Sequence, residues 1–423
     1  MQKLTKTVLF MSSLIYGVVL TNLPIEIFNK ISEITHFDCT NPTIISFVEF
    51  GFLAGATIGC ITTPIYTKKF GYIKSIRALF ILEMVASGLS IIPLGWIYLS
   101  LTRVLSGIFA CALLELAPQY VAEVLTPQER SFSMMMFSVA LNLGNVISYA
   151  VHLPISFDYD SWCITFIVPM AVSFVGFICA HFLVKRDKPQ VKNQADDLIV
   201  SDESASPQVV QKERVFTKLQ IFRLVCAALM LGMTQTVNGV DAILTYASNI
   251  FAGTFKSRNS GIYGSLIIGG MNVAFGLLAT PIVDRCARKL MLSIGVLGVS
   301  ICLILISIIY KFSLGNTFIL ILVSIYLLFF NMGPQPIVYM LFGEMFPQKY
   351  KIKLNALGFT TSLGTSVLAV FSFAFFTGSK QFIIYLIYGI LSVFSGFTAV
   401  FAAPETFGKT LDQIEGVVEG WGK

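Results

Sequence analysis

Two stretches of the sequence carry the same pattern of charge, "YVAEVLTPQER" at residues 120–130 and "LFGEMFPQKYK" at residues 341–351. Each stretch follows an apolar run with a glutamate, Glu123 or Glu344, and places a base, Arg130 or Lys351, seven positions later. Each also has a proline in between. A carboxylate at the end of an apolar segment is costly unless a partner pairs with it. The recurrence predicts an internal repeat, in which both copies meet the same electrostatic requirement.

The composition of the chain is typical of a membrane protein. Apolar residues make up 55% of the 423 residues and charged residues 12%, about half the charged fraction of an ordinary soluble chain. The apolar residues fall into blocks of about twenty, the length that a helix needs to cross a bilayer. The sequence therefore predicts an all-α membrane protein of twelve spans, near 7–28, 43–66, 77–96, 99–124, 131–152, 162–184, 220–248, 260–283, 289–310, 316–342, 352–376 and 381–403.

The spans divide into two sets of six around a polar interval. We expect an N-terminal six-helix half at 1–184, a cytoplasmic linker at 185–219, a C-terminal six-helix half at 220–403 and a cytoplasmic tail at 404–423. The linker is rich in Asp, Glu, Ser and Gln and cannot bury a core of its own. Two six-span halves related as parallel repeats are the architecture of major-facilitator transporters, which bind substrate between the halves at mid-membrane.

The distribution of lysine and arginine predicts the orientation in the membrane. With the N-terminus inside, most basic residues fall in inside segments, and those outside are Lys30, Lys256, Arg258, Lys311 and Lys380. By the positive-inside rule both termini are expected in the cytoplasm, and we expect the plasma membrane as the site of residence. The net charge of +6 follows from this bias and does not indicate nucleic-acid binding. The oligomeric state stays open.

The sequence contains no grouping typical of an enzyme, a metal site or a bound cofactor. The three histidines, His36, His152 and His181, stand apart from one another and from any cysteine at metal-ligand spacing. No nucleophile–base set and no phosphate-binding loop is visible. Cys39 and Cys163 could both face outside, and a disulfide between them is one open prediction.

Charged residues at the cytoplasmic ends of the spans form a candidate gate. Ion pairs that lie partly out of water can hold two halves together in one state and break in another. The alternative is a set of unconnected surface charges. The candidates are Glu123 and Arg130 in the first half and Asp284, Arg285, Arg288, Glu344 and Lys351 in the second.

Five segments match the motifs of one known family in order. They are "RVLSGIFACALLELAPQYVAE" from Arg103, "QTVNGVDAILTYASNIF" from Gln235, "VDRCARK" from Val283, "GPQPIVYMLFGEMFP" from Gly333 and "PETFGKTLDQIE" at 404–415. Together they resemble the sugar porters of the major facilitator superfamily, and more loosely the insect facilitated trehalose and glucose transporters. The resemblance implies the major facilitator fold and a sugar bound between the halves. Glu405, in the last motif, joins the candidate gate residues.

The candidate sugar site consists of polar and aromatic residues inside the spans. Sugar binding needs neutral donors and acceptors together with an aromatic face. Polar residues within spans also bridge helices, and Tyr339 could serve packing alone. The candidates are Ser138 and Asn142 in the first half and Gln235, Asp241, Asn272, Tyr339 and Thr361 in the second.

Asp241 stands where the family has asparagine, and an intramembrane carboxylate is a functional hypothesis by default. It could accept a sugar hydroxyl, bind a cationic substrate, carry a proton, or lie solvated at the outer mouth. Gln235 and Asp241 are six positions apart, which puts them about 120° out of line on an ideal helix. They can share a cavity only if the span unwinds at Gly239.

These features predict a transporter that moves a hexose or a trehalose-like disaccharide by alternating access. The first span contains no acid before Glu26, near its outer end, which favours facilitated diffusion over proton symport. Three alternatives remain: a carrier of another small solute such as an organic cation, a proton-coupled symporter, and a membrane sensor that transports nothing.

Overall fold

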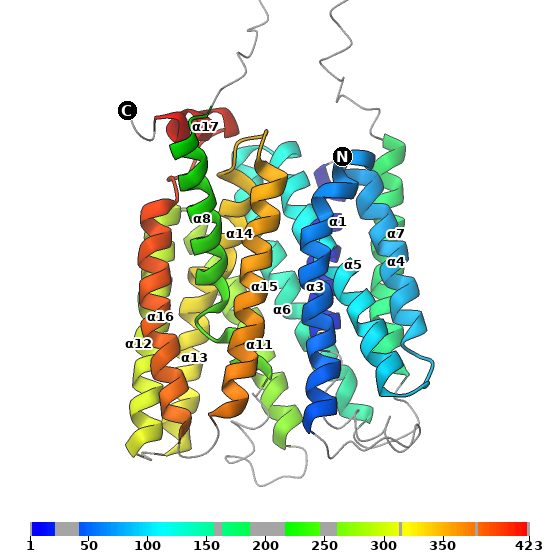
Figure 1. The fold of residues 1–423 in the computed structure, drawn as a ribbon, viewed down its shortest axis with the longest axis vertical. Coiled ribbons are helices and arrows are strands. Elements are labelled where there is room, and N and C mark those ends of the chain that lie inside the picture. Colours follow the sequence, from blue (N-terminus) through cyan, green and yellow to red (C-terminus); the bar gives the residue numbers. More distant parts are fainter. Residues whose placement is uncertain are drawn as a thin grey trace, which may run out of the picture.

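The computed structural model describes residues 2–21, 42–155, 163–186, 216–245, 260–312, 315–376 and 380–420. Within these ranges the regular elements are helices, and most of them stand side by side along one axis (Figure 1). Both chain ends lie at the same end of this bundle, together with the short helix α17 (Leu411–Glu419). We call this end of the bundle the N/C end. The prediction of an all-α chain is confirmed for the described residues.

The first half of the chain forms six long helices. They are α1 (Gln2–Leu20), α3 (Pro42–Phe70), α4 (Tyr72–Leu89), α5 (Trp96–Val124), α6 (Pro127–Ile155) and α7 (Ile164–Arg186). All of them except α4 are long and apolar enough to cross a membrane. The 18 residues of α4 include Lys74, Arg77 and Glu83, and this charge lowers its hydropathy signal. It occupies the place of the predicted third span, so six spans account for this half.

The second half also contains six spans, but two of them are broken. The elements are α8 (Lys218–Thr236), α9 (Val240–Thr245), α11 (Ser260–Val283), α12 (Arg288–Phe312), α13 (Asn316–Met332), α14 (Pro334–Glu344), α15 (Lys351–Phe375) and α16 (Gln381–Ala402). One span consists of α8 and α9, and another of α13 and α14. The second break lies at Gly333, before the two prolines Pro334 and Pro336. A proline lacks the N–H that would continue the helix. Most of the predicted linker lies outside the described residues.

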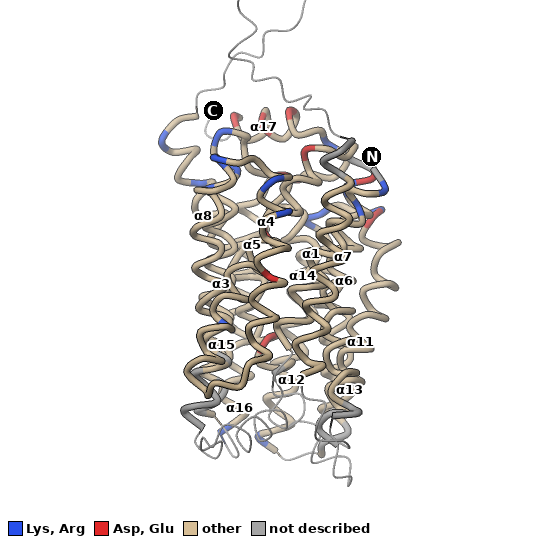
Figure 2. Tube along the Cα trace, turned by 90° about the vertical axis from the view of Figure 1, so that its right-hand side faces the viewer, with Lys and Arg blue, Asp and Glu red and all other residues tan. Residues whose placement is uncertain are grey.

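The outside of the bundle is covered by large apolar side chains. Ile65, Leu94, Phe397 and Phe401 are each 65–71% exposed. Such a surface would drive association in water, but in a bilayer it faces acyl chains. The lysines and arginines drawn in Figure 2 gather mainly at the N/C end. The molecule therefore has the surface of a multi-pass membrane protein.

The two halves pack against each other through a small set of helices. Contacts between α3 and α15 and between α6 and α11 join them, and α14 packs against α5 and α6. Within the first half, α3 and α5 touch backbone to backbone, since a Cβ added to Gly55 would lie 2.0 Å from the carbonyl oxygen of Val104. The helices therefore pack closely inside each half and less closely along the seam between the halves.

Candidate substrate site between the two halves

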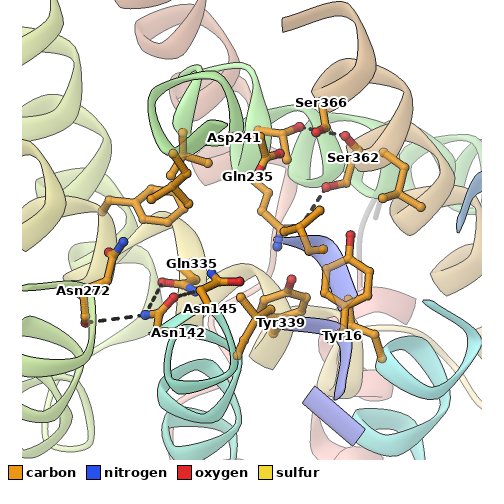
Figure 3. Close-up of a pocket in the computed structure, with 18 of the residues that line it drawn as sticks. Tyr16, Asn142, Asn145, Gln235, Asp241, Asn272, Gln335, Tyr339, Ser362 and Ser366 are labelled. Atoms are coloured by element: carbon orange, nitrogen blue, oxygen red, sulfur yellow. Dashed lines mark hydrogen bonds between the residues drawn. The ribbon is translucent and has the colours of Figure 1, made fainter. Parts of the chain in front are cut away.

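A polar cavity of about 60 Å³ lies on the seam between the halves (Figure 3). Its wall combines five amide side chains, several hydroxyls and one carboxylate with apolar and aromatic groups. The lining residues are Tyr16, Leu20, Leu114, Leu141, Asn142 and Asn145 from the first half, and Gln235, Thr236, Val240, Asp241, Leu244, Asn272, Phe330, Gln335, Tyr339, Phe359, Ser362, Leu363 and Ser366 from the second. Of the predicted site residues, the structure brings Asn142, Gln235, Asp241, Asn272 and Tyr339 together here.

The break between α8 and α9 brings Gln235 and Asp241 to the same cavity. The helix stops after Thr236 and resumes at Val240, and Gly239 adopts a φ of +75°. This left-handed conformation is one that residues with a Cβ rarely adopt. The unwinding that the six-residue spacing required is therefore present.

Asn238 joins the two ends of the broken helix. Its Nδ2 donates to the carbonyl oxygens of Thr234 and Gln235, at 3.1 and 3.0 Å, which end α8. Its Oδ1 accepts from the backbone N–H of Val240 at 3.1 Å, at the start of α9. The Tyr326 hydroxyl, on α13, donates to the same Oδ1 at 3.0 Å. These bonds replace the helical hydrogen bonds lost at the break, as buried backbone groups require.

Two serines of α15 orient the polar groups on either side of the break. The Ser362 hydroxyl donates to Oε1 of Gln235 at 3.1 Å. The Ser366 hydroxyl donates to the carboxylate of Asp241. Because the two serines are four positions apart, they lie on one face of α15. Figure 3 shows both serines beside Gln235 and Asp241.

The opposite wall is a network of amides that crosses the seam. Nδ2 of Asn142, in the first half, donates to Oδ1 of Asn331 at 3.0 Å and to Oε1 of Gln335 at 3.3 Å. Nε2 of Gln335 donates back to Oδ1 of Asn142 at 3.1 Å. Nδ2 of Asn331 donates to Oδ1 of Asn272 at 2.8 Å. The neighbouring Asn145 is 1% exposed, and its Oδ1 has no hydrogen-bond partner among the described residues. This wall offers neutral donors and acceptors to a ligand.

Aromatic rings form another part of the cavity wall. Tyr16 of α1 and Tyr339 of α14 both line it (Figure 3). The Tyr339 ring packs edge-on against Phe137 of α6, with centroids 5.1 Å apart, and lies 5.8 Å from Phe359 of α15. Tyr339 therefore takes part in packing and also faces the cavity, and its contact with a substrate stays a prediction.

Ser138 and Thr361, also predicted for the site, do not line the cavity. Their hydroxyls donate instead to carbonyl oxygens one turn earlier in their own helices, at Met134 and Leu357. In α15 the cavity-facing position is the next residue, Ser362. The sequence also did not predict Tyr16, Asn145, Asn331, Gln335, Ser362 and Ser366. All of them except Tyr16 are amides or serines inside predicted spans, and this polarity within an apolar segment was the available signal.

Two ion pairs join the halves at the N/C end. Nη1 of Arg130 lies 3.7 Å from Oε1 of Glu344, and both side chains are 4% exposed. Nζ of Lys351 lies 3.4 Å from Oε1 of Glu123. The acid of each repeated stretch thus pairs with the base of the other half. The Arg130–Glu344 pair lies out of water and is expensive to separate, whereas Glu123 is partly exposed. Together the two pairs join the ends of α5 and α6 to α14 and α15.

The other predicted gate residues take different positions. Arg288 is buried near Glu344, and its guanidinium stacks over the Phe407 ring at 5.3 Å. The carboxylate of Glu405 accepts the backbone N–H groups of Arg288 and Lys289, at 3.0 and 3.1 Å, and so caps the start of α12. Asp284 and Arg285 lie in the turn before α12 and form no ion pair with any described residue.

Cys39 is not among the described residues, so the predicted Cys39–Cys163 disulfide lies outside them. In the described parts of the chain, no group of three His, Cys, Asp or Glu side chains is arranged to hold a metal ion.

Comparison with known proteins relates the chain to sugar carriers. A D-xylose transporter of Levilactobacillus brevis is 26% identical over 398 residues, which cover 87% of this chain and 86% of that protein. A glucose facilitated diffusion protein of Zymomonas mobilis is 24% identical over 348 residues, covering 74% of this chain and 73% of that one. The facilitated glucose transporter member 2 of Sus scrofa is 24% identical, covering 86% and 75%.

Solved structures of a major facilitator share the fold. The proton:xylose symporter XylE bound to 6-bromo-6-deoxy-D-glucose superposes with a TM-score of 0.84 at 18% identity, covering 98% of both chains. The inward open conformation of XylE from E. coli gives a lower TM-score of 0.71 at 19% identity, covering 97% of this chain and 98% of that one. The predicted major facilitator fold is thereby confirmed.

The sequence profile of the family described as "Sugar (and other) transporter" matches residues 33–417. That match runs from the first half through the last motif, and it agrees with the interpretation as a transporter rather than an enzyme. The chain therefore belongs to the sugar (and other) transporter family of major facilitators.

Proposed function

We propose that this protein carries a monosaccharide across a membrane by alternating access. The observation that carries the proposal is the seam cavity, where neutral amides and hydroxyls from both halves face aromatic rings. A ligand held by both halves can be released to either side when the halves rock about it. The volume of the cavity, about 60 Å³, is room for roughly four to six waters. This size favours one sugar ring over a disaccharide. The named substrates of the relatives, xylose and glucose, agree in size.

The cross-paired ion pairs support the alternating-access part of the proposal. They hold the halves together at the N/C end and leave the cavity between the halves. Alternating access requires a state closed at this end and a second state in which this end is open. Opening that end would separate Arg130 from Glu344 and Glu123 from Lys351. Ligand-binding energy and the regained hydration of the charges would offset the separation.

We further propose that the N/C end faces the cytoplasm and that the protein resides in the plasma membrane. The support is the excess of lysine and arginine in the segments at that end. A protease site inserted near Ser204, in the linker, should be cut in opened cells and spared in intact ones. Cleavage in intact cells would reverse the orientation.

The transport mode that we propose is facilitated diffusion. The support is the first span, which contains no acid before Glu26 near its outer end. Purified protein in liposomes should exchange labelled xylose or glucose in counterflow, with no requirement for a pH gradient. Trehalose should compete weakly. A folded protein that exchanges none of these sugars would refute the proposal, and a rate that rises several-fold with an imposed proton gradient would indicate symport.

A further inference from the structure

Asp241 is the one charged side chain among the described residues that line the seam cavity. No lysine, arginine or histidine nitrogen of the described residues lies within 4 Å of its carboxylate, and its recorded polar neighbour is the hydroxyl of Ser366. The side chain lines the cavity and is only partly buried. A carboxylate accepts several hydrogen bonds, so room for another donor remains.

A lone carboxylate in such a site has an electrostatic requirement that a neutral ligand meets only in part. An ionised group held among protein side chains is unfavourable unless it is paired. A hydrogen bond from a cationic donor to a carboxylate is stronger than one from a neutral hydroxyl. Charge complementarity therefore favours a ligand with a protonated amine next to Asp241.

The rest of the wall excludes a purely apolar cation as the preferred ligand. Asn145 presents an unpartnered buried Oδ1, and Gln235, Gln335 and Asn142 present amides at the same cavity. A hydrocarbon placed against this wall would leave Oδ1 of Asn145 without a hydrogen bond. A ligand that carries hydroxyls would satisfy them.

We propose that the preferred substrate class is a hydroxylated amine of monosaccharide size, namely an amino sugar, whose ammonium group pairs with Asp241 while its hydroxyls meet the amide wall. The inference rests on the proposed sugar transport and specifies its substrate. An amino group replaces a hydroxyl with little change of volume, so glucose and its amino derivatives fit the same space and differ mainly in charge.

The test is competition for glucose counterflow in liposomes at a pH at which the amine is protonated. The competitors are the 2-amino, 3-amino and 6-amino derivatives of glucose, unlabelled glucose, and the N-acetyl form of each amine as a neutral partner. At least one amine should compete roughly five- to ten-fold better than glucose, and its N-acetyl form should lose that advantage.

The matched variants are Asp241→Asn, which removes the charge and keeps the shape, and Glu129→Gln, which removes a carboxylate outside the cavity. Asp241→Asn should abolish the preference for the amine over glucose, whatever rate of glucose exchange the variant has, and Glu129→Gln should retain it. Equal competition by all amines and glucose in the unmodified protein would overturn the inference, as would a preference that survives in Asp241→Asn. If Asp241→Asn does not fold, the comparison of amines with their N-acetyl forms still decides. If the unmodified protein does not exchange glucose at all, the proposed function itself is refuted.

Discussion

At the scale of single residues, the structure distinguishes two adjacent hydroxyls on α15. Ser362 lines the cavity and donates to Gln235 at 3.1 Å, whereas Thr361 donates to its own helix at Leu357. Ser362→Ala should weaken sugar binding by roughly 2- to 12-fold, equivalent to about 0.5–1.5 kcal/mol, because Gln235 loses the donor that orients it. Thr361→Ala should change binding by less than about two-fold.

The measurement is the half-saturation concentration for counterflow of a labelled sugar by the two variants in liposomes. Equal losses in both variants would show that α15 packs in another register. A larger loss in Thr361→Ala would return that residue to the site where the sequence analysis had placed it.

The residue scale also shows why the sequence pattern found only part of the site. Composition and motif position indicate that a polar residue lies inside a span, and this was enough for Gln235, Asn272 and Asn142. Which side of the helix faces the seam depends on the rotation of each helix, and a rotation of 100° separates Thr361 from Ser362. Gln335 and Asn331 were missed because their partners come from elements far away in the sequence.

At the scale of elements, the broken helix α8–α9 depends on Gly239. A Cβ added there would lie 2.4 Å from Cδ2 of Tyr388, and the φ of +75° is unfavourable for any other residue. Gly239→Ala should destabilise the protein by at least about 1–2 kcal/mol from the backbone alone and should move Asp241 relative to Gln235. We expect a lower midpoint of thermal unfolding and a reduced affinity for sugar.

Gly270→Ala is the matched control for this change. Gly270 lies in α11, is exposed on the outside and has open space where a Cβ would be placed. Alanine there should be neutral or stabilising by about 0.5–1 kcal/mol, since glycine is the weaker helix former. If Gly239→Ala behaves like Gly270→Ala, the break is not fixed by the glycine, and Asn238 alone would account for it.

The element scale was partly predictable. The positions of the spans follow from blocks of apolar residues, and the break at Gly239 follows from the requirement that Gln235 and Asp241 share one site. The break at Gly333 was not predicted, although the motif contains Gly333, Pro334 and Pro336, because the apolar run continues through it. The charges of α4 weaken the hydropathy of that helix, but the apolar block near 77–96 still predicted a span there.

At the scale of the whole molecule, each repeated stretch supplies the ion-pair partner that the other requires. Glu344 requires a partner at the end of its apolar run, and the structure places Arg130 of the other half beside it. It equally places Lys351 beside Glu123. No local pattern could assign these partners, because each pair joins residues more than 200 positions apart. The parallel repeat makes them equivalent, and the seam brings them together.

The cross-pairing predicts that charge exchange should preserve the closed N/C end. Arg130→Glu places two carboxylates together in a buried site, and breaking such a pair costs about 3–5 kcal/mol. A change of that size is enough to move a two-state equilibrium from mostly closed to mostly open. The double variant Arg130→Glu with Glu344→Arg restores opposite charges across the seam and should restore the closed state.

The distance between spin labels at positions 74 and 353, in a background depleted of cysteines, reports this equilibrium. Both positions are exposed at the N/C end, one in each half. Lys6→Glu is the control, because its pair with Glu129, at 3.1 Å, lies within the first half and is about one-third exposed. The label distance should lengthen in Arg130→Glu, return to its original value in the double variant and stay unchanged in Lys6→Glu. A double variant that remains as open as Arg130→Glu would mean that Arg130 and Glu344 act through their separate neighbours, such as Arg288, and do not form a gate together.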